Sequence, residues 1–233
     1  MRLLTHYKLP EPIVLEDKKF IWLRILDNNY FCDLLRTLND TVNLNIISDE
    51  SFHLFEEEKE ISLSSKGLMV IDYFNFDINT RKVKSELIKI VNNLIEHSSL
   101  DQNIEQINTS IIELMTSICL NLDLNIEFNH EFDIKDLLKL YDFRVKTKHN
   151  TTCEAIIEWI KVCIELLDIK YYFYVALETY LTFEELLELE KFASYNDVFI
   201  INLSSQNVTS TEINRIKNSL EYTLDKDQCV TIN

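Results

Sequence analysis

The feature that most constrains this chain of 233 residues is that it contains one glycine, Gly67. Loops that grip phosphate need glycines, because only there can backbone N–H groups approach the anion and φ turn positive freely. The Walker A, GxGxxG and GxSxG motifs each need two or more glycines. The sequence therefore excludes these nucleotide-binding and hydrolase motifs, and it favours a protein that binds rather than catalyses.

Short β-branched and aromatic runs alternate with helical patterns over most of the chain. The expected strands are residues 20–25, 43–47, 68–74, 171–177 and 198–203. The expected helices are residues 30–38, 152–167, 182–193 and 210–224. The last three strands are nearly continuous apolar runs, which is typical of strands covered on both faces of a parallel sheet. Thr182 and Glu185 form a capping-box pattern at a helix start. The alternation predicts a doubly wound α/β fold.

The middle of the chain, from about residue 80 to 139, is helical without strands. A long helix of regular apolar spacing is expected on each side of the short polar connection 98–103, with a third, shorter helix at 134–140. We expect the long pair to form an antiparallel hairpin that protrudes as an arm, with a seam at Ile104, Ile107, Ile111, Leu114 and Ile118. Ile112 and Met115 then lie outside and need a partner, which suggests oligomerisation. The alternative is extra core helices of one domain.

This insertion divides the chain into three stretches. Residues 1–78 form the first part of an α/β head, residues 79–149 a helical leg, and residues 150–233 the second part of the head. The five cysteines are scattered, which is typical of reduced thiols in a cytoplasmic protein. The first residues do not resemble a signal peptide. No apolar run approaches the roughly 18 residues of a transmembrane helix, so no membrane association is expected.

Residues 68–72 and 168–170 were the other candidates for chemistry. The first run, four apolar residues ending in Asp72, looks like a Walker B strand, but the phosphate loop it would serve is excluded. Asp168 and Lys170 supply a fragment of the carboxylate-and-lysine pattern of metal-dependent nucleases, a match that often occurs by chance. The glutamate-rich run 56–60 is typical of a solvated loop.

One acidic stretch, residues 123–131, alternates oxygen-bearing and apolar side chains. In an extended segment this alternation places the oxygen ligands on one side, and these ligands are Asp123, Asn125, Glu127, Asn129 and Glu131. Hard oxygen ligands suit calcium. The alternative is a solvated edge whose apolar side packs inward.

Two basic islands stand out in a chain whose formal net charge is −16. Residues 79–91 carry Arg81, Lys82, Lys84 and Lys89, and residues 135–148 carry Lys135, Lys139, Arg144, Lys146 and Lys148. An acidic chain repels nucleic acid on average, so DNA binding would require its cations to gather on one surface. The islands could form one such phosphate-binding patch. The alternative is ordinary lysines on solvated helix surfaces.

Several segments, taken in order, resemble the Csn-two family of type II-A CRISPR systems. They are Glu11–Leu15, Phe76–Asn79, Leu122–Phe128, Thr152–Leu167 and Tyr180–Thr182 followed by Glu184 and Glu185. The resemblance implies an α/β head, similar to P-loop folds but without a working nucleotide site, with an inserted helical leg. It also implies a homotetrameric ring that takes double-stranded DNA ends through a basic central hole, without established catalytic activity. Partners would include CRISPR integrase and effector nuclease proteins.

The same resemblance places the family's calcium segment on Asp123 to Glu131. Two positions that are usually aspartate are Asn125 and Asn129 here, and fewer charges weaken calcium binding. The leading hypothesis is thus a sequence-nonspecific DNA clamp that supports spacer acquisition. The alternatives are a metal-dependent DNA nuclease and a protein-interaction scaffold without DNA binding.

Overall fold

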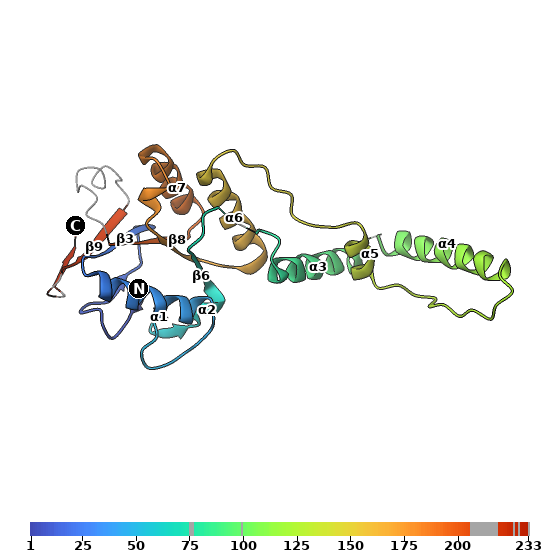
Figure 1. Ribbon diagram of the computed structural model, residues 1–233, viewed down its shortest axis with the longest axis horizontal. Coiled ribbons are helices and arrows are strands. Elements are labelled where there is room, and N and C mark those ends of the chain that lie inside the picture. Colours follow the sequence, from blue (N-terminus) through green and yellow to red (C-terminus); the bar gives the residue numbers. More distant parts are fainter. Residues whose placement is uncertain (75–76, 99, 206–218, 226, 228, 233) are drawn as a thin grey trace. The chain divides into compact units, whose positions relative to one another are not determined.

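The structure, a computed structural model, describes residues 1–74, 77–98, 100–205, 219–225, 227 and 229–232 (Figure 1). The chain divides into two compact units, one of residues 1–76 and 147–233 and the other of residues 77–146. The first unit contains both sheets. Its strands are β1 (Arg2–Thr5), β2 (Ile13–Val14), β3 (Phe20–Ile25), β4 (His53–Glu56), β5 (Lys59–Ile61), β6 (Gly67–Val70), β7 (Tyr171–Val175), β8 (Phe199–Ser204), β9 (Ser219–Leu224) and β10 (Val230–Ile232). Its helices are α1 (Asn28–Val42), α2 (Leu63–Lys66), the 3-10 turn Leu177–Thr179, α6 (Thr152–Leu167) and α7 (Phe183–Tyr195).

The larger sheet has six strands in the order β10-β9-β3-β8-β7-β6. All neighbours are parallel except β10, which pairs antiparallel with β9. The central strand β3 aligns Phe20 with Ile200 of β8 on one side and with Ser219 of β9 on the other. The expected mostly parallel α/β sheet is therefore confirmed.

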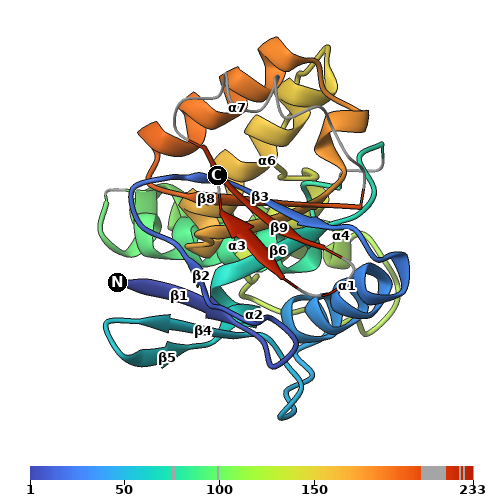
Figure 2. The same cartoon turned by 90° about the vertical axis from the view of Figure 1, so that its left-hand side faces the viewer.

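Helices and a second sheet cover the two faces of this sheet. Figure 2 shows α6 and α7 on one face, with α1 and the four-stranded sheet β2-β1-β4-β5 on the other. The side chains of β3 alternate accordingly: Ile21 and Leu23 belong to the core shared with α1, β1 and β4. On the opposite face, the buried Tyr172 hydroxyl donates to the carbonyl of Ile160 in α6 at 3.3 Å. Burial on both faces explains why these strands are mostly apolar.

Two expected helices of this unit begin at side-chain caps that the sequence already indicates. Thr151 caps α6, where its hydroxyl accepts from Glu154 N, and Thr182 and Glu185 form the expected capping box at the start of α7. These reciprocal bonds satisfy N–H groups that have no partner inside the helix. The helix boundaries expected at 152–167 are those observed.

Two expectations for this unit are wrong. Residues 43–47 are a loop, not a strand, because α1 continues to Val42 and Asn45 adopts a left-handed φ of 55°. Asn43 is held instead by its side chain, which donates to Met69 O at 3.1 Å. Of the helix expected at 210–224, residues 210–218 lie outside the described residues. Residues 219–224 form strand β9, where Tyr222 and Leu224 are buried beside β3.

The second unit contains α3 (Arg81–Glu96), α4 (Leu100–Leu120) and α5 (Ile134–Leu140). Figure 1 shows α4 running on beyond the end of α3, so the expected antiparallel hairpin is wrong. Residues 121–133 make the return path, and the Asn108 side chain of α4 donates to His130 O of this segment at 2.9 Å. The face of α4 around Asn108 is half-buried, including Ile112 and Met115, which were expected to lie outside.

Four of the five residues of the stripe expected as a seam are solvent-exposed, with exposed fractions of 43% for Ile107, 40% for Ile111, 60% for Leu114 and 45% for Ile118. The fifth, Ile104, is half-buried, as Asn108 is. The apolar residues of α4 thus occupy more than one face, and the return segment covers the face that carries Asn108. Among the described residues, no helix is both long and apolar enough to span a membrane.

Candidate nucleic-acid interface

The first basic island lies on the first turns of α3. Thr80 caps this helix, with its hydroxyl accepting from Val83 N at 3.3 Å, and Val83 is fully buried. Fixing Val83 inward leaves Arg81, Lys82 and Lys84 exposed around it. No acidic residue occupies this first turn. Cations are disfavoured at the positive end of a helix dipole, so these residues cost the helix stability, and local helix formation does not explain them.

The second island begins on α5 and continues past it. Asp133 caps α5, and accepting a hydrogen bond from Lys135 N lowers the pKa of its carboxyl. Three of the cations are paired with nearby carboxylates: Lys135 with Asp133 at 3.4 Å, Lys139 with Asp136 at 2.9 Å, and Arg144 with Asp142 at 3.0 Å. All six side chains are exposed, and such pairs contribute little stability. A phosphate group can therefore replace these carboxylates at small cost.

A pair of hydrogen bonds joins the two islands. The Asn79 side chain donates to Val145 O at 3.0 Å and accepts from Val145 N at 2.9 Å. Asn79 lies two residues before Arg81, the first cation of the α3 island, while Val145 lies between Arg144 and Lys146. One carboxamide therefore holds two basic segments together that are 66 residues apart in sequence.

A hollow of about 170 Å³ lies between α3 and α5 in this unit. It is lined by Lys84, Ile88, Leu138, Lys139, Asp142 and Phe143. Lys84 and Lys139 come from different islands and share this hollow. The two islands thus meet at this hollow and at the Asn79–Val145 pair. We name their cations the basic surface; it comprises Arg81, Lys82, Lys84, Lys135, Lys139, Arg144 and Lys146.

The candidate DNA-binding set divides between the units. Lys82, Lys84, Lys135, Lys139, Arg144 and Lys146 belong to residues 77–146, whereas Lys148 belongs to the sheet-bearing unit, where its backbone N–H donates to Glu158. Within the described residues, Lys82, Lys84 and Lys146 form no ion pair. The sequence reasoning missed the role of Asn79. The one signal in the sequence is that an asparagine stands just before the basic first turn of a helix.

The candidate calcium ligands lie along the irregular return segment. Asp123, Asn125, Glu127, Asn129 and Glu131 are all exposed. Two of their apolar neighbours are also exposed, Leu124 at 71% and Ile126 at 39%, whereas Phe128 is half-buried. The described residues bring no three acidic, histidine or cysteine side chains close enough together to hold a metal ion. The oxygen donors suit calcium chemically, but the described residues of one chain alone do not assemble them into a site.

The nucleotide-type features of the head have structural roles. The turn between β3 and α1 contains Asp27, whose carboxylate accepts from Tyr30 N at 2.8 Å and fills the helix N-terminus. A phosphate would meet this negative charge at the position where helix N-termini bind anions. Asp72 lies past the end of edge strand β6 and accepts from Phe74 N at 2.9 Å. Asp168 ends α6 in a left-handed conformation and pairs with Lys66, which lowers the pKa of Asp168.

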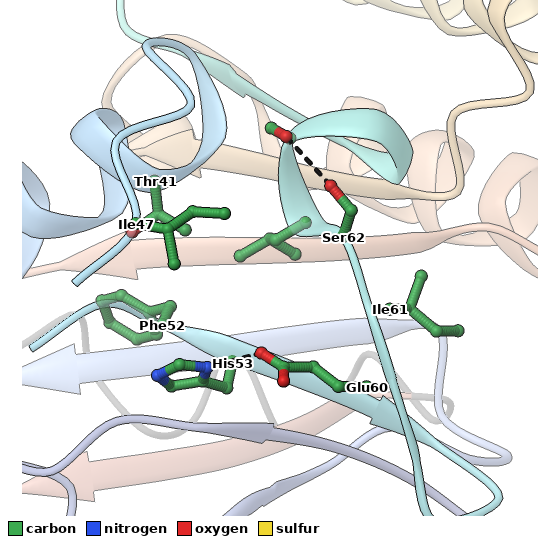
Figure 3. A pocket seen from close by; sticks show the side chains of 9 residues that line it. Thr41, Ile47, Phe52, His53, Glu60, Ile61 and Ser62 are labelled. Atoms are coloured by element: carbon green, nitrogen blue, oxygen red, sulfur yellow. Dashed lines mark hydrogen bonds and ion pairs between the residues drawn. The ribbon is translucent and has the colours of Figure 1, made fainter. Parts of the chain in front are cut away.

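A separate pocket of about 320 Å³ lies beside β4, β5 and the end of α1 (Figure 3). His53 Nδ1 and Glu60 Oε1 are 2.6 Å apart at its edge. Figure 3 shows the His53 ring directed at Glu60 and well separated from the Ser62 hydroxyl, which contacts Ser64 Oγ at 3.0 Å. His53 and Ser62 therefore do not form the hydrogen-bonded pair that a serine nucleophile activated by histidine requires.

Fold and surface together define a class: an α/β protein whose chain is interrupted by a mostly helical unit with an exposed basic surface. The family model described as CRISPR-associated protein (Cas_Csn2) matches residues 46–228, so the chain belongs to this family. It is a CRISPR accessory family and not a known family of enzymes. No individual curated protein matches the chain.

Proposed function

We propose that this protein is a non-catalytic, sequence-nonspecific binder of double-stranded DNA ends that supports the acquisition of new CRISPR spacers. The observation that carries the proposal is the Asn79–Val145 pair, which joins two basic islands into the basic surface. Membership of a CRISPR-associated family supplies the pathway. Lysine and arginine contacts to phosphates give affinity without reading sequence, because they release condensed counterions.

The charge distribution supports this assignment. Residues 77–146 carry eight basic and twelve acidic residues, whereas the whole chain has 23 and 39. Most of the excess negative charge therefore lies in the sheet-bearing unit, which DNA should avoid. Within residues 77–146 the cations are concentrated at both ends of the sequence, and the acidic residues of α4 and the return segment lie between them.

We further propose that the protein works as a homotetrameric ring. The exposed apolar stripe of α4 and the exposed Leu120 and Leu124 support self-association, since such residues normally gain stability by burial against a partner. Calcium at residues 123–131 would then require carboxylates from more than one chain. Measuring the mass in solution with and without calcium tests both points, and a monomer in both conditions would contradict them.

Charge reversal tests DNA binding by the basic surface. We expect Lys84→Glu to weaken binding to a linear duplex and to lower the slope of log K against log salt by about one phosphate contact or more. Lys191→Glu is the matched control, because Lys191 is an exposed lysine of α7 in the sheet-bearing unit. Equal affinities and salt slopes for the two variants would contradict the proposal.

The same preparations test the nuclease alternative. Incubating the duplex with magnesium or manganese should leave it intact, because the described residues gather no carboxylate group for a metal. Cleavage that persists through purification and is lost in Asp168→Asn would instead favour the nuclease. If the unmodified protein binds no duplex even at low salt, the result would favour the third alternative, a protein-interaction scaffold without DNA binding.

A further inference from the structure

The outer face of the four-stranded sheet carries an apolar groove. Leu3 of β1 and Phe55 of β4 are directly opposite each other and form its floor, while the alternate residues Leu4 and Leu54 are buried beneath the sheet. The groove has a volume of about 420 Å³ and is lined by Met1, Leu3, Phe55, Glu57 and Glu58. It belongs to the sheet-bearing unit and is separate from the basic surface.

Carboxylates without cationic partners surround this groove. Glu57 and Glu58 stand on its wall, and an adjoining hollow of about 410 Å³ adds Glu16 and Asp17. In the described part of the chain these four acidic side chains form no ion pair. The two basic side chains that line the adjoining hollow are already neutralised, Arg2 by Glu56 at 2.6 Å and Lys19 by Asp197 at 2.5 Å.

The backbone at the groove wall is strained. Glu57 and Glu58 are the two residues between β4 and β5, and both have positive φ, 49° and 68°. Two-residue hairpin turns of this conformation strongly prefer Asn-Gly, since side chains with a Cβ are disfavoured there. Folding alone would therefore favour other residues at these positions. Residues 56–60, which were expected to form a loop, form the turn of a β-hairpin. The two glutamates at this turn are exposed and lower its stability relative to Asn-Gly.

We propose that this groove is a docking site for a segment of another protein in which large apolar side chains are flanked by lysine or arginine. The apolar side chains would cover Leu3 and Phe55, and the flanking cations would meet Glu16, Asp17, Glu57 and Glu58. Charge complementarity identifies this occupant, because the same carboxylates repel DNA and anionic lipid. The proposal rests on the sheet-bearing unit alone and does not depend on DNA binding.

A fluorescent peptide with a central Leu-Phe pair and three lysines on each side tests the groove by anisotropy with the full chain. We expect saturable binding that is at least tenfold weaker when the lysines are replaced by glutamate, or when Leu-Phe is replaced by Ser-Ser. Equal binding of the charge-reversed peptide overturns the proposal. A second peptide, with the sequence of residues 137–148 of this chain, is also basic and apolar. If it binds more tightly than the Leu-Phe peptide, the occupant is a second copy of this chain and the proposed partner is wrong.

The protein variant Glu57→Asn/Glu58→Gly separates binding from folding. It installs the turn sequence that this backbone prefers while removing both wall carboxylates, so its melting temperature should not fall. We expect at least tenfold weaker peptide binding. The control Glu184→Gln/Glu188→Gln removes two exposed carboxylates of α7 and should bind as the unmodified chain does. Unchanged binding by the Glu57/Glu58 variant overturns the proposal.

Discussion

Replacing Asn79 by alanine should weaken DNA binding without changing any charge. The substitution removes two hydrogen bonds to Val145, of 3.0 and 2.9 Å. Each such bond contributes about 0.5–1.5 kcal/mol, so the attachment of residues 144–146 to the start of α3 should lose about 1–3 kcal/mol. Arg144 and Lys146 would then have to be ordered when DNA binds, at about 1 kcal/mol for each residue fixed. For these two residues the loss in binding is about 2 kcal/mol, which corresponds to roughly thirtyfold weaker affinity.

Fluorescence anisotropy on one linear duplex at several salt concentrations is the assay. The salt slope should stay the same, because the number of cations that reach phosphate is unchanged. Asn93→Ala, an exposed asparagine later on α3, is the control and should bind as the unmodified chain does. If Asn79→Ala also retains full affinity, the two islands do not act as one surface and the reasoning is refuted.

Three further predictions concern the stability of the sheet-bearing unit. Gly67→Ala should lower the free energy of unfolding in urea by about 1–3 kcal/mol, because an added Cβ would lie 2.6 Å from Leu63 O. An unchanged urea midpoint would show that the backbone shifts at no cost and would contradict this prediction. Burial lowers the pKa of His6 from 6.5 to about 4. Between these values the unfolded chain binds a proton that the folded chain does not, so the free energy of unfolding should fall by at most about 3 kcal/mol as the pH drops from 6.5 towards 4. His6→Phe should remove this part of the acid dependence, and an identical pH profile would contradict it. Glu221→Ala should cost about 3 kcal/mol, because it leaves Arg24 buried without the carboxylate now 3.1 Å away; a loss below 1 kcal/mol in the same assay would contradict a role for this pair.

The elements best predicted from the sequence are those in which the order of apolar and polar residues along the chain matches which side chains are buried. Strands β3, β7 and β8 are mostly apolar because both faces are covered, and α6 and α7 begin at caps that can be read directly. Short strands such as β1 and β4 were missed because half of their side chains face solvent, and four residues are too few for an alternation to stand out.

Other errors came from contacts that are distant in sequence. Residues 43–47 look like a strand, but Asn43 is held by Met69, and Leu44 and Ile46 remain exposed. The apolar stripe of α4 indicated an intrachain seam, whereas the return segment contacts a different face. The basic islands were visible in the sequence, but the Asn79–Val145 pair that joins them depends on tertiary structure alone. Whether residues 123–131 bind calcium stays a prediction.

The most direct test of the account compares binding to a linear duplex with binding to the same DNA closed into a covalent circle. A ring that threads onto DNA ends should bind the linear form and bind the circle at least tenfold more weakly at the same salt concentration. Cutting the circle once should restore the affinity. Equal binding to both forms would contradict threading, and no binding to either form would contradict DNA binding by the basic surface.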